Sequence, residues 1–199
     1  MSSTDVPIDP HLLARTGEAA AGMSDLLRTS MSGPQQLNEA AEQVVGAFLA
    51  QLHQYFSHRL ISVVLYGSAA RGELVPTSDI DLLVITEQLP KGAFLRSEPI
   101  RQAREAIGPL CDALFERLGW YPYISVILKT PQEAERGSRL FLDMVEDAKM
   151  LYDRGGFFQQ QLKCLQAKLT RLGARRIGIN GTWYWDLKPD CRWGDVIEL

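Results

Sequence analysis

The chain has 199 residues, of which 46% are hydrophobic and 23% charged, and its formal net charge is −3 at pH 7. This composition predicts one globular domain with a real core. It disfavours long nucleic acid as a partner, because binding a phosphate backbone requires a concentrated basic surface. Apolar runs fall far short of the roughly 20 residues that cross a membrane, and the N-terminus shows no secretory signal, so we expect a cytoplasmic protein without a membrane partner.

The first half of the chain predicts an extension, a helix and two strands. Residues 1–33 are rich in small and polar residues and are expected to form a weakly ordered N-terminal extension. Pro34 in a first turn and apolar residues at three- and four-residue steps predict an amphipathic helix over 34–57. The runs ISVVLY (61–66) and DIDLLVIT (79–86) predict strands.

The second half predicts two further helices, a third strand and a C-terminal helix. A helix over 97–118 should end at Gly119, and a strand should cover 121–128. Thr130-Pro131-Gln132-Glu133 is a capping box, and its helix is expected to run in pieces to Tyr152. Leucines of the stretch 157–172 mark a last helix docked on the domain.

Three strands interspersed with helices predict an α/β or α+β fold with a small mixed sheet flanked by helices. We expect the main domain to span 34–152, with a C-terminal helix and aromatic tail over 153–199 packed on it. The three cysteines, Cys111, Cys164 and Cys191, are few and far apart, so neither a disulfide framework nor a zinc site is indicated, and buried reduced thiols are expected.

The stretch GSAARGELVPTSDID joins the first two strands and carries the most specific pattern. Asp79 and Asp81 stand one apart at the start of a strand, where beside a loop both carboxylates can turn toward one point. Their mutual repulsion then calls for a cation, and hard oxygen ligands of this kind suit Mg²⁺, with Mn²⁺ as an alternative.

The other end of the same stretch predicts an anion site. Gly67 permits a sharp turn, and Ser68 offers a hydroxyl and an N–H at the start of a short helix predicted over 69–74. Arg71 adds a second phosphate partner. A metal site beside an anion site describes a pocket for a metal-bound nucleoside triphosphate. The alternative is a Gly-Ser turn followed by a Ser-Asp cap, and chance alone would give this spacing in roughly 0.003 of such chains.

At these residues the chain resembles the minimal nucleotidyltransferases of the DNA polymerase β superfamily, whose signature is GSxARG followed by SDxDL. Gly67-Ser68, Ala70-Arg71-Gly72 and Ser78 to Leu82 carry the match. The resemblance implies a polymerase β-like nucleotidyltransferase fold with Asp79 and Asp81 as metal ligands. It also implies that the nucleotide and its phosphates are bound by Gly67, Ser68, Arg71 and Ser78.

The same resemblance implies a reaction and its partners. A hydroxyl of a protein or small molecule would attack the α-phosphorus of a nucleoside triphosphate, ATP above others, and release pyrophosphate. Some members of the superfamily are antitoxins that adenylylate a HEPN-type toxin, and others modify aminoglycosides. The chain departs from the pattern at Ser125, where the family usually has a third carboxylate, so the alternative is a nucleotide-binding or regulatory subunit without catalysis.

Two further groups of residues need an interpretation. Asp143, Glu146 and Asp147 fall on a later helix, where we expect solvated or capping side chains, and Asp186 is an outside candidate for the third acid. The aromatic residues of the tail could stack on a base, bind a partner or seal the core as the chain end docks, and the last is favoured. They are Trp183, Tyr184, Trp185 and Trp193.

Overall fold

The computed structural model describes residues 33–179 and 182–192. The expected extension at 1–32 and Trp193 therefore lie outside the described residues. The helices are α2 (Pro34–Phe56), α3 (Gly67–Arg71), α4 (Ala93–Leu118), α5 (Pro131–Glu135), α6 (Leu140–Asp147) and α7 (Phe157–Leu172). The strands are β1 (Leu60–Tyr66), β2 (Ile80–Thr86), β3 (Ile124–Lys129), β4 (Lys149–Asp153), β5 (Arg175–Ile179) and β6 (Thr182–Asp186). Short 3₁₀ turns flank β1 and β4 at Ser57–Arg59 and Arg154–Gly156.

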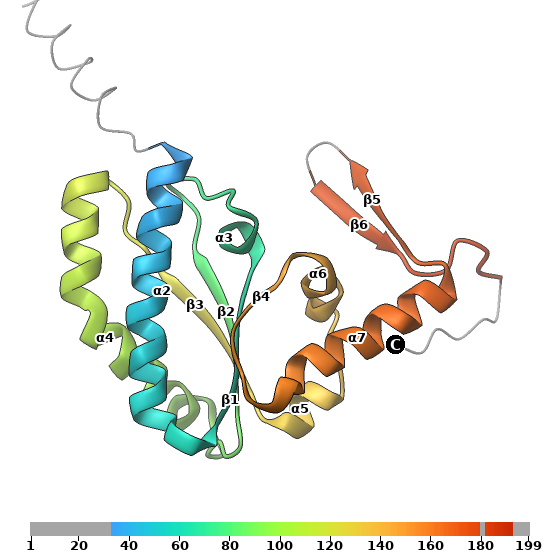
Figure 1. Ribbon diagram of the computed structural model, residues 1–199, viewed down its shortest axis with the longest axis horizontal. Helices are drawn as coiled ribbons and strands as arrows, with labels where there is room; N and C mark the ends of the chain where they lie inside the picture. The colour runs from blue at the N-terminus through green and yellow to red at the C-terminus, as the bar shows by residue number, and fades with distance from the viewer. Residues whose placement is uncertain (1–32, 180–181, 193–199) are drawn as a thin grey trace, which may run out of the picture.

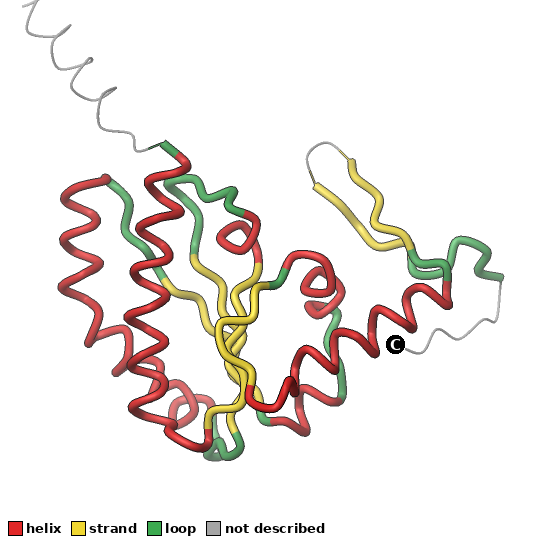
Figure 2. The backbone as a smooth tube through the Cα atoms, viewed as in Figure 1, coloured by secondary structure: helices red, strands yellow, loops and turns green. Residues whose placement is uncertain are grey.

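A mixed sheet of order β3-β2-β1-β4 forms the centre of the molecule (Figures 1 and 2). β1 pairs antiparallel with β2 and β4, whereas β2 and β3 run parallel. The parallel pair is possible because the long helix α4 carries the chain back between these two strands. The mixed α/β class and the helix-flanked sheet are confirmed.

The fourth strand corrects the sequence prediction, which extended a helix through this segment to Tyr152. α6 stops at Asp147, and Lys149–Asp153 instead pairs with the free edge of β1, Leu65 standing opposite Lys149. Five residues are too few to show a period clearly. These residues form a strand because the edge of β1 is available for pairing, and their own sequence pattern does not indicate a strand.

Two helical layers bury the two faces of the sheet. α2 and α4 cover one face, where Phe48 and Phe56 are almost completely buried over β1 and β2. α5, α6 and α7 cover the other face, where Phe158 packs edge-on against Phe141. Each buried phenylalanine of this kind contributes about 1.5–3 kcal/mol through the apolar surface it removes from water.

The ends of the helices follow the expected signals. Pro34 stands in the first turn of α2, and Gly119 ends α4 in the left-handed conformation with φ +65°. Thr130 and Glu133 form the complete capping box at α5: the Thr130 hydroxyl accepts from Glu133 N, and the Glu133 carboxylate accepts from Thr130 N. These three predictions are confirmed.

Asp153 ties the end of β4 to the start of α7 and to the core. Its carboxylate accepts the N–H groups of Phe158 and Gln159, each at 3.0 Å, and the hydroxyl of Ser62 at 2.6 Å. Ser62 is completely buried. One side chain therefore satisfies two free N–H groups of a helix start and the hydroxyl of a buried strand residue.

Replacing Asp153 should therefore weaken the fold more than an ordinary helix cap does. We expect Asp153→Ala to lower the free energy of unfolding by about 2–4 kcal/mol, because it removes the cap and leaves a buried hydroxyl without a partner. Ser62→Ala removes only the hydroxyl contact and should cost about 1 kcal/mol or less. Urea unfolding monitored by circular dichroism measures both, and equal losses would contradict the capping role.

The C-terminal tail forms a hairpin that the sequence did not predict. β5 and β6 pair antiparallel, and Trp183 and Trp185 are half-buried beside α6, outside both core clusters.

Of the three cysteines expected to be buried, only Cys111 is buried, whereas Cys164 and Cys191 are exposed. Among the described residues, no helix has the length and apolar character needed to traverse a membrane.

Candidate functional site

The candidate residues meet at one end of the sheet because of its strand register. Tyr66, the last residue of β1, stands opposite Asp81 of β2, and Asp81 stands beside Ser125 of β3. The chain leaves β1 directly into α3, so the Gly67-Ser68 turn begins next to Asp81. Figure 1 shows α3 and α6 at this end of the sheet.

Gly67 and Asp81 lie in direct contact. Gly67 has φ +71°, and a Cβ at this position would lie only 2.7 Å from Oδ2 of Asp81. Such a distance is well inside van der Waals contact, so a side chain at position 67 and the observed carboxylate exclude each other. The Gly-Ser turn therefore lies against Asp81 of the Asp-x-Asp pair, although ten residues separate the two motifs in the sequence.

Burial and two neighbouring side chains shift the pKa of Asp81. Partial burial raises the pKa of its carboxyl group, the Ser125 hydroxyl lowers it by donating a hydrogen bond, and the charge of nearby Asp79 raises it again. Burial and the Asp81 charge also raise the pKa of Tyr66 to about 12, so this phenol stays protonated. Asp79 itself is exposed. Two close carboxylates with an unfavourable mutual charge favour a bound cation.

The residues present fit a divalent cation shared with a phosphate ligand. Within the described ranges no group of three or more histidine, cysteine or acidic side chains could hold a metal alone. Mg²⁺ does not require such a group, since it commonly binds one or two carboxylates together with water and the phosphates of a substrate. Asp79 and Asp81 supply two carboxylates, and neither forms an ion pair with a described lysine or arginine.

The short helix differs from its prediction. It was expected over 69–74 but begins at Gly67 and ends at Arg71, because Gly72 adopts φ +75° and terminates it. Five residues carry only a small helix dipole. Any anion held here would depend mainly on the backbone N–H groups of the turn at Gly67 and Ser68, which lies against Asp81.

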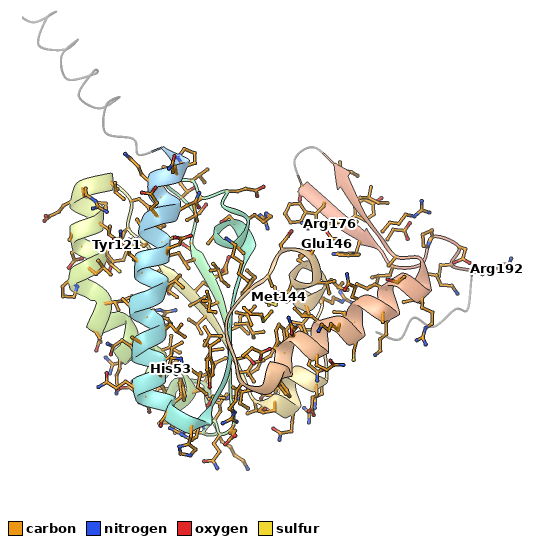
Figure 3. The ribbon with its side chains drawn as sticks, viewed as in Figure 1. His53, Tyr121, Met144, Glu146, Arg176 and Arg192 are labelled. Carbon is orange, nitrogen blue, oxygen red and sulfur yellow. The ribbon has the colours of Figure 1, made fainter. Side chains whose placement is uncertain are left out.

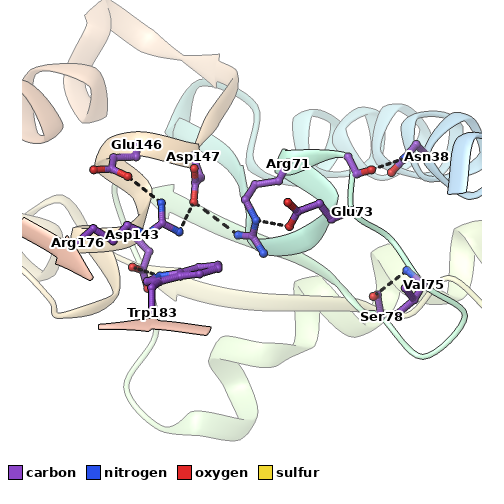
Figure 4. Close-up of polar contacts among 11 residues, drawn as sticks. Asn38, Arg71, Glu73, Val75, Ser78, Asp143, Glu146, Asp147, Arg176 and Trp183 are labelled. Atoms are coloured by element: carbon purple, nitrogen blue, oxygen red, sulfur yellow. Dashed lines mark hydrogen bonds and ion pairs between the residues drawn. The ribbon is translucent and has the colours of Figure 1, made fainter. Parts of the chain in front are cut away.

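Arg71 points away from this turn toward α6 (Figure 4). It pairs with Glu73 at 2.6 Å and with Asp147 at 3.6 Å, and its guanidinium lies 4.7 Å from the ring centre of Trp183. Ser78 is likewise occupied, since its hydroxyl accepts the N–H of Val75 at 3.1 Å and closes a turn. The structure thus brings Gly67, Ser68, Asp79 and Asp81 together, but engages Arg71 and Ser78 elsewhere.

The acids of α6 correct another expectation. Asp143 was expected to be solvated or capping, yet it accepts the indole N–H groups of Trp183 and Trp185, each at 3.0 Å. Glu146 and Asp147 pair with Arg176 at 2.7 and 2.9 Å. Asp186 lies in the hairpin, opposite Arg175. The alternation of Trp183 and Trp185 in TWYWD was the one sequence signal for a strand with a tryptophan face.

Gly67→Ala should disturb the site, whereas Gly72→Ala should not. Both glycines have positive φ, so each alanine should cost about 1–2 kcal/mol of stability. Only at position 67 would the new Cβ displace the Asp81 carboxylate; at position 72 the nearest atom, Nδ2 of Asn38, is 3.8 Å away. We expect Mg²⁺-ATP affinity to fall about tenfold or more for Gly67→Ala alone. Isothermal titration and thermal unfolding measure the two effects, and equal affinities would contradict the contact.

Comparison with known proteins supplies a family. A model of the nucleotidyltransferase domain matches residues 47–139, which include Gly67, Asp81 and Ser125. A curated protein of Methanocaldococcus jannaschii, named "Putative protein adenylyltransferase", is 33% identical over 132 residues, or 65% of this chain and 83% of its own.

Two solved structures are similar at lower identity. A toxin-antitoxin structure with AMP-PNP has 19% identity, covering 63% of this chain and 90% of that one, with a TM-score of 0.37. Spectinomycin adenyltransferase of Enterococcus faecialis with ATP and spectinomycin has 15% identity, covering 66% of each chain, with a TM-score of 0.39. At these TM-scores neither likeness supports an inference about ligand or acceptor.

Proposed function

Because this chain belongs to the nucleotidyltransferase family, we propose that it transfers the adenylyl group of ATP to a hydroxyl of a protein. The observation that carries the proposal is the contact between the Asp81 carboxylate and the Gly67 turn, with Asp79 beside it. This contact puts a candidate cation site next to a candidate phosphate site at one end of the sheet.

The residues have separate tasks in this reaction. Asp79 and Asp81 would hold Mg²⁺ together with the triphosphate, and the turn at Gly67 and Ser68 would bind the β- and γ-phosphates. When bound, the metal neutralises phosphate charge and stabilises the leaving pyrophosphate. The acceptor oxygen forms a bond to the α-phosphorus as the bond from that phosphorus to the β-phosphate oxygen breaks. Ser125 is no base, so the proton of the hydroxyl leaves to solvent.

A protein acceptor is favoured over a small molecule by one comparison. The archaeal relative, of which this chain covers 83%, is named for adenylylation of a protein. A HEPN-type toxin is the first acceptor to test, and an aminoglycoside hydroxyl is the small-molecule alternative. Neither is identified by a contact within the chain.

A second candidate function rests on Ser125. It occupies the β3 position in register with Asp81 and donates a hydrogen bond to it, where a third carboxylate would complete the acidic set. Such a site could bind Mg²⁺-ATP without transferring it, as a regulatory subunit would. The two candidates differ in whether the α-phosphate becomes covalently attached.

Label transfer separates them. Protein incubated with α-labelled ATP, Mg²⁺ or Mn²⁺ and lysate of the source cells should label a macromolecule or small molecule. Asp79→Asn and Asp81→Asn should each reduce the labelling about 100-fold or more, since the charges that hold the metal are lost. Asp112→Asn, an exposed acid on α4, is the control and should have no effect. Tight ATP binding without any transfer would establish the regulatory candidate instead.

Ser125→Asp should increase transfer. A carboxylate beside Asp81 would add a metal ligand and a base for the acceptor hydroxyl, and general-base assistance should raise the rate about tenfold or more. It should also increase the stabilisation by Mn²⁺ in thermal unfolding, because three acids repel one another without a cation. Ser125→Asn, of equal size and without charge, should show neither gain. A rate no higher for Asp than for Asn would contradict the assignment of this position.

A further inference from the structure

The C-terminal hairpin contacts the acidic side of α6 next to α3. Asp143, Glu146 and Asp147 of α6 contact the hairpin. Figure 3 shows Glu146 and Met144 on this helix, and Met144 is buried against the sheet. Asp147 is within ion-pair distance of Arg71 in α3. These carboxylates therefore adjoin the helix that begins with the proposed phosphate turn.

Carboxylates at this place are a disadvantage for the proposed ligand. A triphosphate carries several negative charges, and like charges within a few ångströms disfavour its binding. Acids at this edge are tolerable only if cations or hydrogen-bond donors balance them. The hairpin provides such groups to the acids of α6.

Arg176 and the two tryptophans supply this balance. The guanidinium of Arg176 donates to Glu146 at 2.7 Å and to Asp147 at 2.9 Å, and the indole of Trp183 donates to Asp143 (Figure 4). The indole of Trp185 donates to the same carboxylate. The guanidinium groups of Arg176 and Arg71 lie 3.8 and 4.7 Å from the ring centre of Trp183. The hairpin thus makes ion pairs, hydrogen bonds and cation–π contacts with one small region.

Asp147 links the hairpin to the site, because Arg176 and Arg71 compete for it. Its Oδ2 atom lies 2.9 Å from Arg176 and 3.6 Å from Arg71. Arg176 is the nearer of the two and donates a hydrogen bond to this carboxylate. Without it, Asp147 would hold Arg71 more strongly and direct an unbalanced charge toward the phosphate turn.

We propose that Arg176 is a positioning residue for the triphosphate: it neutralises Asp147 and so leaves Arg71 available to the phosphates. This inference rests on the proposed function, and it assigns the hairpin a task in nucleotide binding. When the triphosphate enters, Arg71 exchanges its ion pairs with Glu73 and Asp147 for contacts with the phosphates. The ligand is the nucleoside triphosphate of the proposed function, and the inference concerns the residues that determine its affinity.

The test measures Mg²⁺-ATP affinity of the full chain by isothermal titration. Arg176→Gln should weaken binding about five- to tenfold, since Asp147 would then hold Arg71 more strongly and leave it less available to the phosphates. Adding Asp147→Asn to this variant should restore the affinity to within about twofold of wild type, because the one carboxylate of α6 that pairs with Arg71 is then neutral. The loss should shrink at about 0.5 M salt.

Two control variants separate charge from structure. Arg175→Gln removes the same charge from the neighbouring position of β5, where the side chain is exposed, and should bind as wild type. Arg176→Lys keeps the charge without the planar fork and should retain most of the affinity. Far-ultraviolet circular dichroism and thermal unfolding check that each variant folds.

Two results would overturn the inference while leaving the proposed function intact. One is unchanged affinity in Arg176→Gln; the other is a loss that Asp147→Asn does not repair, which would make Arg176 merely a structural contact of the hairpin. If the wild-type chain fails to bind Mg²⁺-ATP, the proposed function falls and the inference falls with it.

Discussion

The site depends on the close approach of the Asp81 carboxylate to a residue without a side chain. Oδ2 of Asp81 occupies the space that a Cβ of residue 67 would need. The acid is thereby held against the turn, and partial burial raises its pKa while the Ser125 hydroxyl opposes that rise. A carboxylate kept in such a place is costly to the free protein. In the proposed function, a cation bound between Asp79 and Asp81 would offset this cost, and the offset would contribute to the affinity of the site.

The register of the strands brings Asp81 close to the turn at Gly67. β1 ends at Tyr66 opposite Asp81, and the parallel neighbour β3 places Ser125 on the other side of the same residue. Since successive side chains of a strand alternate between faces, a shift of one residue would turn Asp81 into the core formed with α2 and α4. The buried neighbours Leu82 and Leu83, which pack into opposite core clusters, prevent that shift. Core packing and site geometry are therefore set by the same alternation.

The sequence predicted those parts of the molecule that have local causes. Pro34, Gly119 and the Thr130 capping box determine helix ends through their own backbone chemistry, and the Gly-Ser turn and the acid pair are recognisable by spacing. β4 could not be predicted, since its five residues become a strand only because β1 offers a free edge. The partners of Arg71 were also unreadable: Asp147 and Trp183 reach it from segments more than 70 and 110 residues away along the chain. Only tertiary folding brings such charges together.

The tail illustrates why residue type alone misdirected the interpretation of α6. Acids on an amphipathic helix are usually solvated, and aromatic residues at a chain end usually enter a core. Here each group satisfies the other: the indole N–H groups need acceptors, and Asp143 needs donors. A hydrophobic core could not have accommodated those N–H groups without a cost of desolvation. The tryptophans are consequently half-buried against α6 rather than within the core, and their position brings Arg176 to Glu146 and Asp147. The hairpin thus lies against an acidic surface of α6 that adjoins α3, and it brings a positive charge to that surface.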